Sequence, residues 1–247
     1  MGGKAVSKNV IVAVCDSLFI EQTKYLFGAL RKYGKWQGDL VLLANDICDQ
    51  TKRDFQNHGV IVHDISATCY WAKVFIFDTF MKQWEKVIYF DQDFYIHKDV
   101  NSLFDQIQDK VIVDKECCKI GEQFQLDKDN EQADFLKSKV DLMDESFNAS
   151  CIIFPSAIIQ DDTMQQLETL RVNLHNINWL NGNNDVDQPA LNVYFYKQWQ
   201  QIKNVCFNGV KNNDTIASHL THYHVDNLYR GAKSLHTQCV DFFMGNI

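Results

Sequence analysis

The chain has 247 residues, a formal net charge of −8 and a charged fraction of 23%, and 46% of its residues are hydrophobic. This length is enough to bury a sizeable core, and we expect a single domain because no low-complexity stretch marks a linker. The acidic balance argues against a nucleic-acid backbone or an anionic membrane as the main partner, since both require a basic surface.

The sequence also bears on location. It contains no apolar run long enough to span a membrane, which would need about 18 residues. Residues 1–17 lack the apolar segment and the small-residue cleavage site of a secretory signal. The eight cysteines are spread out without metal-ligand spacing, which is typical of reduced, structural thiols. We therefore expect no transmembrane segment and a cytoplasmic location.

Strand and helix patterns alternate through the first part of the chain. Short runs of mostly β-branched and apolar residues predict strands, and apolar positions at helical spacing predict the helices between them. Asp16 and Ser17 are helix-start residues, and Gly59 closes the second helix. The predicted strands are residues 9–15, 40–44 and 60–63. The first predicted helix starts at Asp16 and Ser17 and runs to Gly34, with apolar residues at helical spacing over 26–33, and the second covers residues 48–57. This alternation predicts right-handed crossovers and a mainly parallel, doubly wound sheet.

A buried helix is predicted next, over residues 70–81 (YWAKVFIFDTFM), because this segment is apolar on nearly all sides. Lys73 lies within it. Its ammonium group either reaches out to water along the surface or supplies a positive charge near a bound phosphate. The second interpretation is favoured because the helix leads directly into the segment described next.

Two carboxylates follow a strongly apolar strand in residues 86–105 (KVIYFDQDFYIHKDVNSLFD). The run 87–90 is typical of a strand buried on both faces, and ligands bind at the carboxyl ends of such strands in open α/β sheets. If the backbone stays extended, Asp91 and Asp93 share a face and Gln92 points the other way. Paired carboxylates repel each other, and a divalent cation relieves this repulsion while leaving coordination positions for phosphate.

The second half continues the α/β pattern. Residues 127–144 are highly charged and predict a solvated helix and loop. Asp187, just before Gln188 and Pro189, is either a helix N-cap or a functional carboxylate. The other predicted elements are a short helix at 101–106, strands at 111–113 and 147–154, and helices at 158–174 and from 187 through 194.

Three histidines lie within six residues near the end of the chain, in THYHVD and the residues before it. His222 and His224 share a face if the segment is extended, whereas His219 and His222 share a face if it is helical. Clustered imidazoles indicate that at least one is a metal ligand. A site of imidazole and carboxylates with Asp91 and Asp93 would suit manganese better than calcium.

The order of these motifs resembles glycosyltransferase family 8, which includes glycogenin and bacterial lipopolysaccharide galactosyltransferases. The resemblance rests on Lys73, the KVIYFDQDFYIHKDVNSLFD segment, FNAS at 147–150, DQPALN at 187–192 and the late histidines, and it covers roughly residues 9–233. It implies an α/β fold of the A-type glycosyltransferase (GT-A) class, a Rossmann-like, mainly parallel sheet flanked by helices. The nucleotide-binding half would be about 9–105, and the half that completes the acceptor and metal sites about 106–235.

The resemblance also implies an activity: metal-dependent, retaining transfer of a hexosyl or pentosyl group from a nucleotide sugar, commonly UDP-linked, with Mn²⁺ or Mg²⁺. The acceptor, a carbohydrate or a protein, is unknown, and a homodimer is left open. The implied metal ligands are Asp91 and Asp93 with His222, preferred, or His219. The implied donor-binding residues are Val14, Asp16, Lys73, Asp91, Gln92 and Asp93, and the implied catalytic residues are Asn148, Asp187 and Gln188.

Some positions depart from the family pattern, and two other function classes are retained. Gln92, Phe94 and Ser150 replace residues that are usually small, small or β-branched, and glycine, respectively. One alternative is therefore a nucleotide-sugar-binding module without turnover. The other is a haloacid-dehalogenase-like phosphatase, which also places Asp-X-Asp after an apolar strand, although generally on its first strand, whereas three predicted strands precede Asp91 here.

Overall fold

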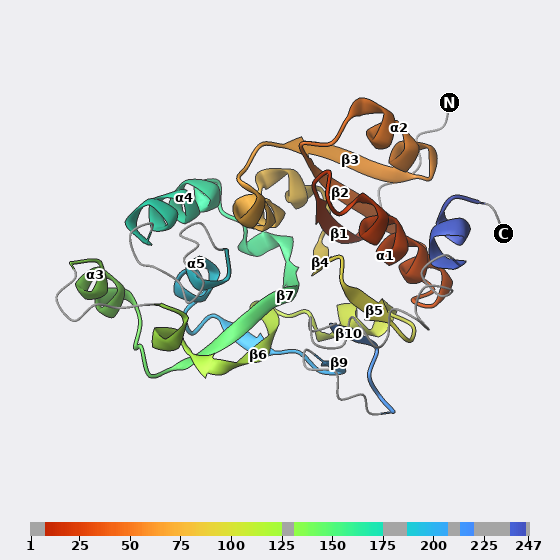
Figure 1. The fold of residues 1–247 in the computed structure, drawn as a ribbon. Coiled ribbons are helices and arrows are strands. Elements are labelled where there is room, and N and C mark those ends of the chain that lie inside the picture. The colour runs from red at the N-terminus through yellow and green to blue at the C-terminus, as the bar shows by residue number, and fades with distance from the viewer. Residues whose placement is uncertain (1–7, 125–130, 175–186, 207–212, 220–237, 246–247) are drawn as a thin grey trace.

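The computed structural model describes residues 8–124, 131–174, 187–206, 213–219 and 238–245. Its centre is a seven-stranded sheet with the strand order β3-β2-β1-β4-β7-β6-β8 (Figure 1). Strands β1 to β4 are mutually parallel, β7 is antiparallel to both of its neighbours, and β8 is parallel to β6. The prediction of an α/β fold with a mainly parallel sheet flanked by helices is confirmed.

The elements follow in chain order. The strands are β1 (Asn9–Cys15), β2 (Asp39–Asn45), β3 (Val60–Ile65), β4 (Lys86–Phe90), β5 (Phe94–Ile96), β6 (Val111–Lys119), β7 (Glu145–Pro155), β8 (Trp199–Gln201), β9 (Val205–Cys206) and β10 (Ala217–His219). The α-helices are α1 (Ile20–Lys32), α2 (Asp49–Asn57), α3 (Glu131–Lys139), α4 (Thr163–Leu174) and α5 (Asp187–Tyr194). The 3₁₀ helices are η1 (Cys69–Phe77), η2 (Thr79–Gln83), η3 (Asn101–Gln106), η4 (Ile120–Gln123) and η5 (Ser156–Ile158).

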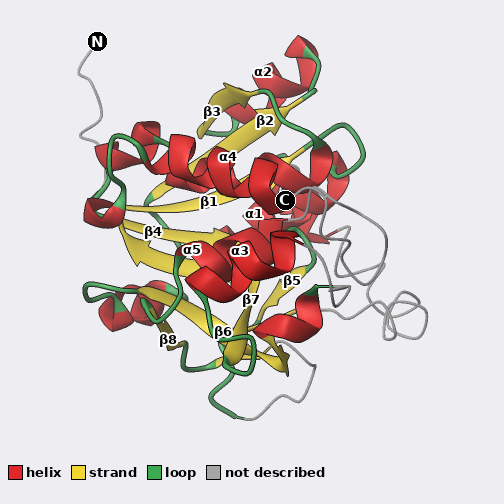
Figure 2. Ribbon diagram, turned by 90° about the vertical axis from the view of Figure 1, so that its left-hand side faces the viewer, coloured by secondary structure: helices red, strands yellow, loops and turns green. Residues whose placement is uncertain are grey.

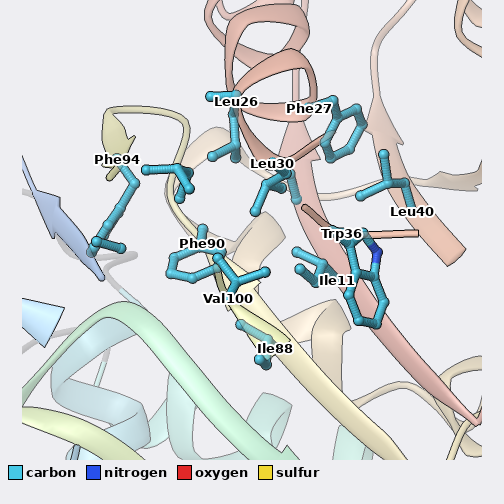
Figure 3. Packing of buried hydrophobic residues seen from close by; sticks show 14 of the residues in the cluster. Ile11, Leu26, Phe27, Leu30, Trp36, Leu40, Ile88, Phe90, Phe94 and Val100 are labelled. Atoms are coloured by element: carbon cyan, nitrogen blue, oxygen red, sulfur yellow. The ribbon is translucent and has the colours of Figure 1, made fainter. Parts of the chain in front are cut away.

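Two apolar layers enclose the sheet, one on each face, because side chains alternate along every strand. In β1, Val10 and Val12 face the layer that includes η1, α4 and α5, and Ile11 and Ala13 face the layer that includes α1. Figure 2 shows α4 and α5 on one side of the large sheet, and Figure 3 shows Ile11 with Leu26 and Leu30 of α1. Four residues of β1, from Val10 to Ala13, have no exposed surface. This burial on both faces explains why the sequences of the central strands are continuous apolar runs.

A second, three-stranded sheet has the order β5-β10-β9, and it brings the late chain to the end of β4. β10 pairs antiparallel with β5, so that His219 lies opposite Phe94 and Ala217 lies opposite Ile96. These strands have only two or three residues each, and the sequence analysis did not predict them.

The single helix predicted over residues 70–81 is wrong. The segment forms η1 and η2, separated by Asp78, whose extended backbone (ψ 149°) interrupts the run and whose carboxylate accepts a hydrogen bond from Phe80 N (2.7 Å). Its burial is as expected: Trp71 and Val74 are among the buried core residues.

Other boundaries also differ. The first helix begins at Ile20 rather than at Ser17, because Asp16 Oδ1 instead accepts a hydrogen bond from Leu18 N (2.8 Å) in the preceding turn. The helix expected from residue 158 begins at Thr163, after η5, and the strand expected at 111–113 continues to Lys119. Helix α3 is not fully solvated, since Leu136 has no exposed surface.

Two further findings concern the described residues as a whole. None of the helices within these ranges is both long and apolar enough to cross a bilayer. The seven cysteines whose side chains are described are all free thiols, and three of them, Cys15, Cys151 and Cys239, are buried. Burial raises the pKa of Cys15 to about 12, which keeps this thiol neutral.

The close contact between α1 and the helical residues 238–243 yields a prediction. A Cβ atom added at Gly28 would collide with the backbone carbonyl of Cys239, so we expect Gly28→Ala to force the two helices apart. Overpacking of this kind costs about 1–3 kcal/mol. Urea denaturation would measure the loss in the free energy of unfolding. The control, Gln22→Ala on the same helix, should change it by less than about 0.5 kcal/mol, and an equal effect of the two substitutions would contradict the packing argument.

Candidate active site

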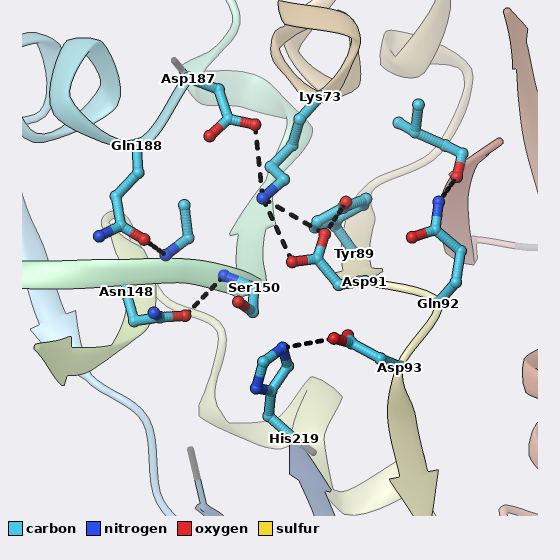
Figure 4. A network of polar contacts seen from close by, with 12 residues as sticks. Lys73, Tyr89, Asp91, Gln92, Asp93, Asn148, Ser150, Asp187, Gln188 and His219 are labelled. Carbon is cyan, nitrogen blue, oxygen red and sulfur yellow. Dashed lines mark hydrogen bonds and ion pairs between the residues drawn. The ribbon is translucent and has the colours of Figure 1, made fainter. Parts of the chain in front are cut away.

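Asp91 and Asp93 lie at the carboxyl end of β4, as predicted, but the backbone between them is not extended. The chain turns at Gln92 and Asp93, and Phe94 N bonds back to Asp91 O (3.3 Å). The extended-strand argument for their shared face is therefore wrong. The turn still leaves both carboxylates on one side, while the Gln92 amide turns away to donate a hydrogen bond to Val14 O (Figure 4).

His219 completes a group of three potential metal ligands. Its Nε2 atom lies 2.9 Å from Asp93 Oδ2, and one ligand atom each from Asp91, Asp93 and His219 lies within 4.8 Å of the others. The pairing of β10 with β5 explains the contact, because His219 lies opposite Phe94, the residue that follows Asp93. His222, the residue preferred from the sequence, lies outside the described residues, as does His224.

The donor set fits a divalent cation. Asp93 Oδ1 is buried and has no hydrogen-bond partner among the described residues, which is costly unless a ligand occupies it. The side chain of Asp93 as a whole remains 43% exposed, so an ion can reach it from solvent. Two carboxylate oxygens and an imidazole nitrogen favour manganese or a similar first-row ion over calcium.

Lys73 joins this group to a third carboxylate. Its Nζ atom lies 3.3 Å from an oxygen of Asp91 and 3.4 Å from Asp187 Oδ2, and all three side chains are at least four-fifths buried (Figure 4). Burial by itself lowers the pKa of Lys73, but the attraction of Asp187 and Asp91 outweighs it and the pKa ends above its usual value. Burial raises the pKa of Asp187, and Lys73 offsets this only in part. Lys73 thus contacts carboxylates from both halves of the chain.

Helix α5 is hydrogen-bonded to the part of β7 that lies beyond the pairing of β7 with β4. Asp91 N donates to Ser150 O (2.8 Å), and beyond this point the backbone of β7 bonds to side chains of α5. Ala149 N donates to Gln188 Oε1 (3.0 Å). Asn192 accepts from Phe147 N (2.8 Å) and donates to Phe147 O (2.9 Å). These bonds fix Asp187, the first residue of α5, beside Lys73.

Asn148 is held by hydrogen bonds on both sides of its amide. Its Oδ1 accepts from Ser150 N (2.8 Å) and its Nδ2 donates to Glu116 Oε2 (2.8 Å). The other carboxylate oxygen of Glu116 accepts from Cys117 N (2.9 Å). The side chain of Asn148 is therefore oriented at the same edge of the sheet as Gln188 (Figure 4).

The remaining sequence candidates lie at the end of β1. Val14 is buried and its carbonyl accepts the Gln92 hydrogen bond, which ties β1 to the turn after β4. Asp16 follows the strand and holds the next turn through Leu18 N. The described candidates therefore gather at the carboxyl ends of β1 and β4 and the neighbouring part of β7.

Sequence analysis missed two residues of the site's framework, Glu116 and Asn192. Glu116 lies beyond the predicted end of its strand, in a stretch that pairs irregularly with β7. Asn192 is the last residue of DQPALN. An asparagine on an apolar helix face needs hydrogen-bond partners, and this could have indicated its role.

The attachment of α5 can be tested at Asn192. In Asn192→Ala, the buried N–H and C=O groups of Phe147 lose their partners, and we expect the free energy of unfolding to fall by about 2–4 kcal/mol. Chemical denaturation would measure the change. Asn173→Ala, on the exposed face of α4, removes the same side chain and should cost less than about 0.5 kcal/mol. A loss at Asn192 no larger than at Asn173 would show that these bonds do not hold the helix.

Comparison with known proteins gives a family match and a set of similar structures. The profile of the family described as Glycosyl transferase family 8 matches residues 41–224. A search of curated protein sequences gives no match. Among solved structures, the galactosyltransferase LgtC in complex with donor and acceptor sugar analogues is 12% identical, with a TM-score of 0.61 over 93% of this chain and 95% of that one.

Two larger proteins are also similar. The bifunctional glycosyltransferase WbbM is 16% identical, with a TM-score of 0.59 over 94% of this chain and 45% of that one. The glycosyltransferase GlyE of Streptococcus pneumoniae TIGR4 is 18% identical, with a TM-score of 0.57 over 95% of this chain and 51% of that one. This chain thus spans about half the length of these two proteins. At such identities the likeness shows the fold, which is the A-type glycosyltransferase fold.

Proposed function

The chain belongs to glycosyltransferase family 8, and we propose that it transfers a sugar from a nucleotide sugar by a metal-dependent, retaining reaction. In this proposal Asp91, Asp93 and His219 hold the cation. The main support for the proposal is that Lys73 contacts both Asp91 of this group and Asp187, at the carboxyl ends of the strands, where open α/β sheets bind ligands.

The cation would be Mn²⁺ or Mg²⁺, and it would supply a Lewis acid beside the diphosphate of the donor. The leaving nucleoside diphosphate gains negative charge as the bond to the sugar breaks, so a positive charge near it favours the transition state. Lys73 is the buried cation of this chain that lies nearest to the ligand group among the described residues. A charge-assisted contact of this kind contributes about 1.5–3 kcal/mol.

The sugar itself would lie beside α5. Asp187 is buried and faces Lys73, so its carboxylate can stabilise positive charge that develops on the sugar ring. Gln188 uses its amide oxygen to bind Ala149 N, which leaves the amide NH₂ group to donate to a sugar hydroxyl. Asn148 is oriented toward the same region by Glu116 and Ser150. We assign no protein nucleophile.

The donor would be UDP-linked, as is common in the family, with Val14, Asp16 and Gln92 near its nucleoside. These residues lie where the end of β1 meets the turn after β4. The acceptor is a carbohydrate or a protein. Structural support for the phosphatase alternative is weak, because Asp91 follows the fourth strand of the chain and His219 lies against Asp93.

One prediction of the proposed function concerns the metal ligands Asp91, Asp93 and His219. In Asp93→Asn, one negative ligand is lost, and we expect Mn²⁺-dependent release of nucleotide from a donor sugar to fall at least about 100-fold. The assay incubates the protein with MnCl₂ and a panel of nucleotide sugars and measures free nucleotide. The matched control is Asp161→Asn, which changes an exposed carboxylate that pairs with Lys82 in the turn before α4, and it should retain full turnover.

The same assay separates the function classes. Full activity of Asp93→Asn would exclude the metal assignment. Phosphate released from p-nitrophenyl phosphate with Mg²⁺ and no nucleotide release would indicate a phosphatase. Calorimetric binding of a nucleotide sugar without turnover would indicate a binding module.

Another prediction of the proposed function concerns the effect of Lys73 on the pH dependence of activity. Burial raises the pKa of Asp187 and Lys73 opposes this, so Lys73→Met should raise that pKa further. Activity that needs ionised Asp187 is lost as the pH falls through this pKa. We therefore expect the acid limb of the kcat/KM profile to move to higher pH, together with an approximately 10- to 100-fold loss of kcat/KM at the optimum.

The control for this substitution is Lys82→Met, which removes an exposed ammonium paired with Asp161. Its pH profile should match that of the unmodified protein. An unshifted acid limb in Lys73→Met would exclude the coupling between Lys73 and Asp187.

A further inference from the structure

Tyr89 is a buried residue of the site to which neither the sequence analysis nor the proposed mechanism gives a role. It lies in β4, two positions before Asp91, which directly follows the strand, and the two side chains lie on the same side of the backbone (Figure 4). Its side chain is almost fully buried, with 1% of the residue exposed. The hydroxyl group donates a hydrogen bond to Asp91 Oδ1 (Figure 4).

Asp91 is therefore contacted by two side chains before any ion arrives. Tyr89 donates to one carboxylate oxygen, and Lys73 Nζ lies 3.3 Å from the carboxylate. The same ammonium lies 5.6 Å from the centroid of the Tyr89 ring, so the three side chains pack as one unit. A carboxylate held in this way has little freedom to rotate.

Each oxygen of a carboxylate has two lone pairs, so a hydrogen bond to Tyr89 does not prevent Asp91 from binding a cation. Hydrogen bonds to metal-binding carboxylates instead fix their orientation, and the loss of such a bond typically weakens metal binding by about 10- to 100-fold. Asp93, by contrast, has one buried oxygen without a partner among the described residues. Within the ligand group, the orientation of Asp91 is thus set by its neighbours in the protein.

We propose that Tyr89 is a positioning residue that holds Asp91 in the orientation needed to bind the divalent cation. This inference rests on the proposed function, because it assumes that Asp91 is a metal ligand. Tyr89 itself contacts neither the ion nor the donor in this role.

The test is Tyr89→Phe, which removes one oxygen atom and keeps the ring that packs against Lys73. We expect the Kd for Mn²⁺, measured from the electron paramagnetic resonance signal of free Mn²⁺ without donor, to rise about 10-fold. A thermal melt on the same samples confirms that the variant is folded at the temperature of the titration. The measurement needs no enzymatic turnover.

Tyr194→Phe is the matched control. It removes a tyrosine hydroxyl that lies 3.4 Å from Thr163 Oγ1, a contact with no member of the ligand group. Loss of this hydroxyl should leave the Kd for Mn²⁺ unchanged. A general loss of stability would act in both variants, whereas a positioning role changes the Kd only in Tyr89→Phe.

The possible outcomes are distinct. A Kd for Tyr89→Phe within twofold of the unmodified protein would overturn the positioning role and leave the metal assignment intact. An equal rise in both variants would also overturn it. If the unmodified protein binds Mn²⁺ no better than Asp93→Asn does, the metal part of the proposed function fails as well.

Discussion

The candidate site depends on one buried electrostatic interaction, the contact of the Lys73 ammonium with Asp91 and Asp187. Two carboxylates this far from water would repel each other and would be costly to bury without a cation between them. Because Asp91 directly follows β4 and Asp187 begins α5, the same interaction links the first half of the chain to the second. It acts beside the antiparallel pairing of β4 with β7, which joins the two halves through the large sheet.

Much of the central sheet could be predicted from the sequence, because burial on both faces leaves a clear pattern. Residues 10–15 and 87–90 are continuous apolar runs, and both lie in strands. The position of Asp91 at the carboxyl end of such a strand led to the candidate site, and in the structure Lys73 lies between Asp91 and Asp187. Asp187 could be placed at the start of a helix because Pro189 is accepted only in the first turn.

The parts that could not be predicted depend on contacts between segments far apart in sequence. His219 reaches Asp93 through β5 and β10, strands of three residues each, which are too short to show a period. The break at Asp78 depends on a single capping bond, and apolar composition over residues 70–81 does not reveal it. Asn192 bonds to the part of β7 that lies beyond its pairing with β4, and the point where this pairing ends is set only when the sheet is assembled.

The small sheet has a consequence for how stability is distributed in the molecule. His219 belongs to β10, so local opening of that strand would remove one of the three proposed ligands. An ion that binds only the closed form then shifts this opening equilibrium by mass action, by about 2.7 kcal/mol when its concentration is 100 times its Kd. Amide hydrogen exchange in residues 217–219 would thus be slower with the ion present, so the protection of β10 would report how far the site is filled.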